Sequence, residues 1–425
     1  MNSRQRVEAT LNHQTPDQIP LDLGASPVTG MHVSSVYKLR QALALDPPQT
    51  PVRVIEPYQM LGEIKPDLID ALGVDVVGLW SPKTMFGFPL EGWKPWSFFD
   101  GTPVLVPDGF NTTPEPNGDI LMYPEGDQSF TPSGRMPAGG FYFDAIVRQA
   151  PINEDNLDPA DNLEEFQLIS DDDLAYYENE AKRLFTQTDK AILGNFGGTG
   201  FGDIALVPGI QLRHPKGIRD MTEWYMSTIT RREYVWKVFE QQCEIGLENL
   251  KRIHARVGEK ISVLFVSGTD FGAQNRPFIA PKTYRELYQP FHKTINTWVH
   301  ENTTWKTFIH SCGSVVQLYP DFIAAGFDIL NPVQTSAAGM DPENLADQFG
   351  HQVTFWGGGV DTQQTLPFSS PEEIRAQVRE RINIFGRQGG FVFNPIHNVQ
   401  AGVPVENLLA LYQAVAEYRA DVLDG

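Results

Sequence analysis

The chain has 425 residues, of which 41% are hydrophobic and 20% are charged, a composition typical of a globular protein. Its formal net charge of −20 disfavours binding to nucleic acids and to anionic membranes, which carry charge of the same sign. Two cysteines exclude a disulfide framework, and the sequence shows neither a signal peptide nor an apolar run of about 18 residues. We therefore expect a cytoplasmic protein that binds neither nucleic acid nor membranes.

Eight short apolar runs, each ending in glycine or polar residues, predict β-strands. They span residues 19–24, 74–80, 191–198, 261–268, 305–313, 327–334, 353–359 and 390–398. Amphipathic segments such as 219–257 and 371–388 separate most of them and predict helices. The second of these helices is expected to start at Ser370 as N-cap, with Glu373 three residues later. Eight strands alternating with helices predict a (β/α)8 TIM barrel that forms a single domain over all 425 residues.

Residues 81–150 break this alternation, because they are rich in proline, glycine and aromatic residues. They predict an insertion after the second strand. Within it, "TPVLVPDG" (102–109) and "GDILMYPEG" (118–126) are expected to pair as a β-hairpin. The insertion is long enough to form a lid or a dimer surface, and an excursion without function explains it equally well.

Polar residues directly after the apolar runs are the candidate site residues, because barrel enzymes hold their active sites at the C-terminal ends of the strands. They are Asn195, Asp270, Gln274, His310, Cys312, Asn331, Gln334, Asp361, Gln363, Asn394, His397 and Asn398. Together they predict a site at the mouth of the barrel. For any one of them, a hydrogen bond that caps a turn or holds a loop is an equally good explanation.

His310 and Cys312 form a His-x-Cys pair at a strand end, where alternate side chains share one face. Imidazole and thiolate are both good zinc ligands, and a catalytic zinc needs three protein ligands. Cys243 is a poor third ligand, because it lies on the apolar side of a predicted helix. His397 ends the last apolar run and is expected to face the same mouth. The alternative is a pair of hydrogen-bonded histidines beside a structural thiol.

Four stretches resemble the uroporphyrinogen decarboxylase superfamily over nearly the full length of the chain. They are "RVEATLNHQTPDQIPLDLG" at the start, "HSCGSVVQLYPDFIAAGFDILNPVQ" in the middle, and "FWGGGVDTQQTLP" and "GGFVFNPIHNVQAGVPVENLLAL" near the end. The resemblance implies a (β/α)8 barrel and a homodimer. It leaves two activities open.

The first activity is the cofactor-free decarboxylation of uroporphyrinogen. Enzymes with this activity hold the carboxylates of the substrate with an arginine-rich segment near the first strand, whereas the corresponding segment here has no arginine before Arg40. A substrate with eight carboxylates needs a basic cleft, which this sequence does not show. His397 matches a histidine of the decarboxylases and so does not discriminate.

The second activity is methyl transfer to or from a corrinoid protein. The chain resembles the zinc-dependent methylcobamide:coenzyme M methyltransferases, whose zinc motif is His-x-Cys followed far downstream by a second cysteine. Here "HSC" supplies His310 and Cys312, and His397 in "NPIH" replaces the second cysteine. One thiolate and two neutral imidazoles give a zinc site with a net charge near +1, a stronger Lewis acid than one with two thiolates. This departure puts coenzyme M as methyl acceptor in doubt and fits a demethylase equally well.

We therefore predict a corrinoid-dependent methyltransferase with one Zn²⁺ at His310, Cys312 and His397. Asp270 and Asp361 are the predicted catalytic groups. The predicted substrate-binding residues are Asn195, Gln274, Asn331, Gln334, Gln363 and Asn398. The sequence has no Asp-x-His-x-x-Gly motif, so the cobalamin is expected on a separate corrinoid protein. A decarboxylase and a non-catalytic ligand-binding barrel are the alternatives.

Overall fold

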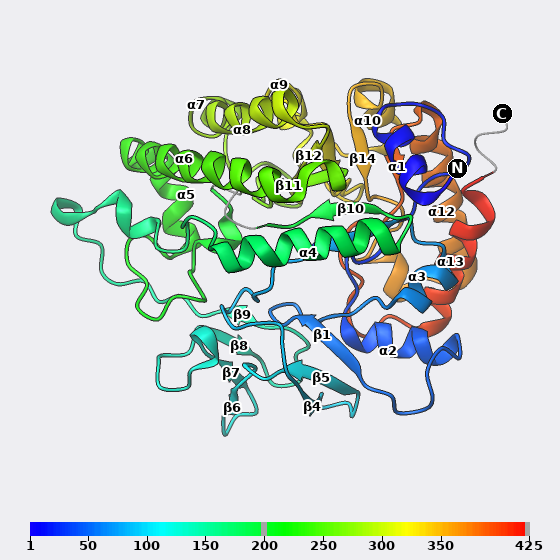
Figure 1. Ribbon diagram of the computed structural model, residues 1–425, viewed down its shortest axis with the longest axis horizontal. Coiled ribbons are helices and arrows are strands. Elements are labelled where there is room, and N and C mark those ends of the chain that lie inside the picture. Colours follow the sequence, from blue (N-terminus) through cyan, green and yellow to red (C-terminus); the bar gives the residue numbers. More distant parts are fainter. Residues whose placement is uncertain (197–201, 421–425) are drawn as a thin grey trace.

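The computed structural model describes residues 1–196 and 202–420 (Figure 1). Within these residues, seven parallel strands form one curled sheet in chain order. They are β3 (Val76–Leu79), β10 (Ala191–Gly194), β11 (Val263–Ser267), β12 (Lys306–His310), β13 (Ile329–Asn331), β14 (Thr354–Trp356) and β15 (Phe391–Val392). Each lies within one of the predicted runs and is shorter than it. The last two residues of the predicted run 191–198 lie outside the described residues.

The remaining predicted run, residues 19–24, closes the sheet, although it is too short to count as a strand. Leu21 forms a parallel bridge with Phe393, and the backbone N–H of Asp22 donates to the Phe393 carbonyl over 2.9 Å. On its other side, the Asp75 N–H donates to the Leu21 carbonyl over 2.7 Å. The segment therefore lies between β15 and β3, and the predicted (β/α)8 barrel is confirmed.

Helices surround the sheet on the outside (Figure 1). They are α2 (Val33–Ala42), α3 (Pro66–Leu72), α4 (Asp171–Gln187), α5 (Met221–Thr230), α6 (Arg232–Val257), α7 (Pro281–Leu287), α8 (Gln289–Asn302), α9 (Tyr319–Ala324), α10 (Pro342–Phe349), α11 (Thr365–Phe368), α12 (Pro371–Phe385) and α13 (Val405–Tyr418). The predicted start of α12 is confirmed: Ser370 and Glu373 form a reciprocal capping box. In the described part of the chain, no helix is long and apolar enough to cross a membrane.

The barrel interior is filled by one side chain or two from each strand, including Leu193, Phe308 and Trp356. The first helix, α1 (Ser3–Leu11), adds Val7 and Leu11 to the same cluster and so closes the N-terminal end of the barrel. Since side chains on a strand alternate between faces, His310 shares the inner face with Phe308. The site residues are thus directed to the opposite, open end.

The region between the first barrel strand and β10 differs from the sequence prediction. It contains β1 (Val52–Glu56), β2 (Leu61–Gly62), β4 (Trp93–Ser97), β5 (Pro103–Pro107), β6 (Thr112–Pro114), β7 (Ile120–Met122), β8 (Gly134–Met136) and β9 (Asp144–Ala145). In the described residues these form two sheets, in the orders β2-β1-β5-β4 and β6-β7-β8-β9. The strands β1 and β2 were not predicted.

The predicted hairpin of 102–109 with 118–126 is wrong, because β5 pairs with β4 and β1, and β7 pairs with β6 and β8. Two tighter turns explain the difference. Asp100-Gly101 joins β4 to β5 and Asn117-Gly118 joins β6 to β7, with φ of 82° and 90° at the two glycines. These dipeptides favour short hairpins, whose loops cost less entropy to close than the longer connection that was predicted.

Candidate metal centre

His310 is the last residue of β12 and is almost fully buried, with 3% of its surface exposed. Its Nδ1 lies 2.6 Å from the side-chain oxygen of Asn331, at the end of the neighbouring strand β13. Its Nε2 lies 3.4 Å from Sγ of Cys312. Parallel pairing of His310 with Asn331 in the sheet sets this arrangement, and it aims Nε2 at the thiol.

Cys312 follows two residues after the strand and is half-buried. Its backbone N–H donates to Oδ1 of Asp270 over 2.7 Å, and this carboxylate oxygen lies 3.8 Å from Nε2 of His310. Burial, followed by the charge and the hydrogen bond of Asp270, raises the pKa of the Cys312 thiol well above its usual value. Without a metal the sulfur therefore keeps its proton at neutral pH, and binding of a metal would release it.

His397 lies in the loop between β15 and α13, and its ring packs edge-on against that of His310 with centroids 5.2 Å apart. The backbone N–H of Asn398 donates to its Nδ1 over 2.8 Å. Burial lowers the pKa of both histidines to about 4, so both rings are neutral at pH 7. Neutral imidazole is the form that binds a metal.

The structure brings the three predicted ligands together: one ligand atom from each of His310, Cys312 and His397 lies within 4.8 Å of the other two. The donor set fits zinc, which binds imidazole nitrogen and thiolate sulfur. Cys243 is buried in α6, and burial raises its pKa to about 12. The sequence prediction that Cys243 packs as a small apolar residue agrees with this position.

Two predicted glutamines extend the network around Cys312. The side-chain oxygen of Gln334 accepts the Gly313 N–H over 2.7 Å, and its amide nitrogen donates to Gln274 over 3.1 Å. Gln274 in turn donates to the Ser336 carbonyl over 2.6 Å. These contacts hold the turn that carries Cys312 against the β13 loop.

Other predicted site residues have structural partners. Asp361 accepts the backbone N–H groups of Gln363 and Gln364 before α11, and Gln363 is exposed. Asn195 donates to the Ala25 carbonyl over 2.9 Å. The Asn398 side chain binds Gly30 N, Pro27 O and Gln59 Oε1, which occupies its amide in holding the 27–30 loop. These contacts give no support to catalytic or substrate-binding roles for the four residues.

Three residues that the sequence did not single out hold the loop bearing Asp270. Asp203 accepts the Gly268 N–H over 3.2 Å, the Tyr225 hydroxyl donates to the Asp270 carbonyl, and Ser311 accepts the Phe271 N–H over 2.9 Å. Burial raises the pKa of Asp203 to about 6. Of the three, only Ser311 could have been noticed in the sequence, because it is the middle residue of the His-x-Cys motif.

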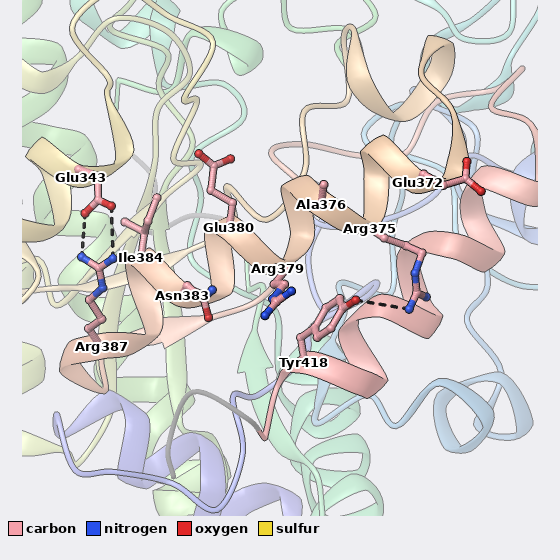
Figure 2. Close-up of a pocket in the computed structure, with 10 residues that line it drawn as sticks. All are labelled: Glu343, Glu372, Arg375, Ala376, Arg379, Glu380, Asn383, Ile384, Arg387 and Tyr418. Carbon is pink, nitrogen blue, oxygen red and sulfur yellow. Dashed lines mark hydrogen bonds and ion pairs between the residues drawn. The ribbon is translucent and has the colours of Figure 1, made fainter. Parts of the chain in front are cut away.

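An open groove of about 650 Å³ lies away from this centre, along α12 and the end of α13 (Figure 2). Two of its arginines are already paired: Arg387 binds Glu343 over 2.8 Å, and Arg375 pairs with Glu417, which lies outside the groove. The groove lies on outer helices and not at the strand ends, so we do not assign the chemistry to it.

Comparison with known proteins shows which proteins this chain resembles. Residues 216–418 match the family model for uroporphyrinogen decarboxylase (URO-D). The uroporphyrinogen decarboxylase of Mannheimia succiniciproducens is 29% identical over 134 residues, which are 31% of this chain and 35% of that protein. The enzyme of the same name from Pseudoalteromonas atlantica is 22% identical over 214 residues, 48% of this chain and 58% of the relative. These matches support the uroporphyrinogen decarboxylase superfamily for this chain.

The matched stretches span between about a third and six tenths of these two relatives. Among solved structures, a methyltransferase from Methanosarcina mazei aligns with a TM-score of 0.54 and 14% identity, covering 98% of this chain and 99% of that one. At this identity the alignment shows a shared fold. The barrel is thus a fold shared with that methyltransferase, and the chemistry depends on the site.

Proposed function

We propose that this protein is a zinc-dependent methyltransferase. It moves a methyl group between a small O- or S-methyl compound, or a thiol, and the cobalamin of a partner corrinoid protein, and O-demethylation is the candidate reaction. The observation that carries the proposal is the convergence of His310, Cys312 and His397, whose ligand atoms lie within 4.8 Å of one another. The fold shared with the Methanosarcina mazei methyltransferase supports it.

In this proposal His310, Cys312 and His397 hold the zinc, which when bound supplies a Lewis acid that polarises the substrate heteroatom. Asp270 lies beside both His310 and Cys312 and is placed to take the thiol proton when Cys312 becomes a thiolate. Gln334 keeps the Cys312 turn in place through Gly313. The residues of the chain thus orient the ligands, and the corrinoid comes from the partner at the open end of the barrel.

Decarboxylation of uroporphyrinogen is the second candidate, because curated relatives carry that name. Arg40, the first arginine of the segment near the first strand, gives this second activity no support. Arg40 is 1% exposed, and its guanidinium forms hydrogen bonds to both Asp46 and Asp67. Since these two carboxylates already hold Arg40, it is not available to bind the carboxylates of a substrate.

The test is the metal content of the purified protein, measured by mass spectrometry for the wild type and for Cys312→Ala and Cys243→Ala. We expect about one zinc per chain in the wild type and in Cys243→Ala, and loss of zinc in Cys312→Ala. Zinc-loaded wild type should also transfer methyl groups from small methyl ethers or thioethers to free cobalamin that has been reduced to Co(I), with release of the alcohol or thiol. The change in cobalamin absorbance follows the reaction.

Two results would contradict the proposal. A metal-free protein that decarboxylates uroporphyrinogen at full rate would establish the second candidate. A zinc-loaded protein that transfers no methyl group to cobalamin in the Co(I) state would favour a non-catalytic binding barrel.

A further inference from the structure

Asn331 ends β13 and is 2% exposed, with both ends of its side-chain amide in contact with neighbours. Its Nδ2 donates to the backbone carbonyl of Trp356 over 2.8 Å. Its Oδ1 lies 2.6 Å from Nδ1 of His310. The amide therefore joins three adjacent strands, β12, β13 and β14, at the mouth of the barrel.

The Trp356 contact fixes which way the amide points. A backbone carbonyl can only accept hydrogen bonds, so the NH₂ group must face Trp356 and Oδ1 must face His310. An amide oxygen can only accept, so the short contact requires the proton of the neutral imidazole to be on Nδ1. The lone pair of the ring is then on Nε2, which lies 3.4 Å from Sγ of Cys312.

His397 is held in the opposite way. Its Nδ1 accepts the Asn398 backbone N–H over 2.8 Å, so its neutral ring carries the proton on Nε2. Neither nitrogen then has a free lone pair, so His397 can bind a metal only after its contact with Asn398 breaks. The two histidines are 5.2 Å apart between ring centroids but have different tautomers. The difference arises from their partners, a side-chain carbonyl in one case and a backbone N–H in the other.

We infer that Asn331 is a positioning residue that holds His310 in the Nδ1–H tautomer, which leaves Nε2 free to bind the metal. This inference rests on the proposed function, which supplies the zinc that His310 would bind. The tautomer itself is a property of the metal-free protein. Hydrogen-bonded partners of metal-binding histidines commonly fix the ring in this way, and their loss lowers metal affinity about 10- to 100-fold.

The first measurement is the tautomer of His310 in the metal-free wild type, read from long-range ¹H–¹⁵N correlations of protein labelled at histidine nitrogen, with His310→Gln for assignment. We expect Nδ1–H on His310 and Nε2–H on His397. A proton on Nε2 of His310 in the wild type would overturn the inference without any variant.

The second measurement compares variants for tautomer and for Zn²⁺ affinity, by competition with a chelator. Asn331→Leu removes the acceptor, so His310 should shift towards Nε2–H and affinity should fall about 10- to 100-fold. Asn331→Asp keeps an oxygen facing Nδ1 and should retain both the tautomer and most of the affinity. Asn296→Leu is the matched control, because Asn296 is a fully buried asparagine of α8 that donates to the Ala325 carbonyl over 2.9 Å.

The outcomes separate this inference from the proposed function. If the wild type binds no Zn²⁺ but His310 has Nδ1–H and loses it in Asn331→Leu, the proposed metal fails and the role of Asn331 in setting the tautomer stands. If Asn331→Leu keeps wild-type tautomer and affinity, or if Asn296→Leu weakens Zn²⁺ binding as much, the inference is overturned.

Discussion

Glu56 is a buried carboxyl group at the end of β1, with 4% of its surface exposed. Its oxygens accept the backbone N–H groups of Tyr58 and Gln59 over 3.0 and 2.7 Å. Burial outweighs these bonds and raises its pKa from 4.5 to about 7. Between these two values the folded protein keeps a proton that the unfolded chain loses, so the stability that Glu56 contributes is full below pH 4.5 and falls as pH rises through 7.

Replacing this group should remove part of the pH dependence of stability. Glu56→Gln stays neutral at every pH, and the hydrogen bond that it loses costs the same at every pH. We therefore expect the free energy of unfolding of Glu56→Gln, relative to the wild type, to rise by up to about 3 kcal/mol from pH 4.5 to pH 8.

Urea unfolding at four pH values measures this difference. Glu91→Gln, at an exposed glutamate, is the control and should follow the wild-type curve. Parallel curves for Glu56→Gln and the wild type would show that the Glu56 carboxyl group does not titrate in this range.

Asn331, Asn398 and Asp361 have similar places in the sequence, each near the end of a predicted strand, and no pattern in the sequence distinguishes their roles. The hydrogen-bond partners of the three residues distinguish their roles. Asn398 binds Gly30 and Gln59, which are 368 and 339 residues away, whereas Asp361 binds N–H groups two and three residues away. A single sequence predicts which residues meet at the barrel mouth, because strand ends meet there. It does not predict which of them face inwards and which hold loops.

At the scale of single elements, α12 is the clearest case of a local signal that the structure retains. The Ser370 hydroxyl accepts the Glu373 N–H over 3.4 Å, and the Glu373 carboxylate accepts the Ser370 N–H over 2.8 Å. Ser370→Ala removes the first of these and should lower the free energy of unfolding by about 1 kcal/mol. Urea unfolding checks the value, with Ser97→Ala as control, because Ser97 is an exposed residue of β4. An equal loss in both variants would mean that the capping box adds nothing.

The strands of the insertion show where element prediction fails. The apolar residues of β5 and β7 correctly predict strands, but the hairpin predicted between the two is wrong. The turns at Asp100-Gly101 and Asn117-Gly118 pair β5 with β4 and β7 with β6. The parallel pairing of Val52 with Val104 depends on the path of the chain through α3 and β3. No local pattern contains that information, so β1 and its neighbours could not be predicted.

At the scale of the whole molecule, Asp75 joins the two ends of the chain where the barrel closes. Its side chain is 2% exposed, and its Oδ1 lies 2.6 Å from Nη1 of Arg6 in α1. Its Oδ2 accepts the Leu21 N–H over 3.0 Å and lies 3.4 Å from Nη1 of Arg419, after α13. One carboxylate thus holds the N-terminal helix, the closing segment and the C-terminal arginine together.

Arg6 also binds Asp17, whose side chain is 39% exposed, and this provides a matched comparison on one guanidinium. Asp75→Asn leaves the buried Arg6 and the half-buried Arg419 without their shared anion and should lower the free energy of unfolding by about 3–5 kcal/mol. Asp17→Asn removes a solvated partner and should cost about 1 kcal/mol or less. Urea unfolding with matched baselines measures both values. Equal losses of stability in the two variants would show that barrel closure does not depend on the buried carboxylate. A loss in Asp75→Asn alone would mean that the Asp75 side chain stabilises the barrel by holding α1, the closing segment and Arg419 together.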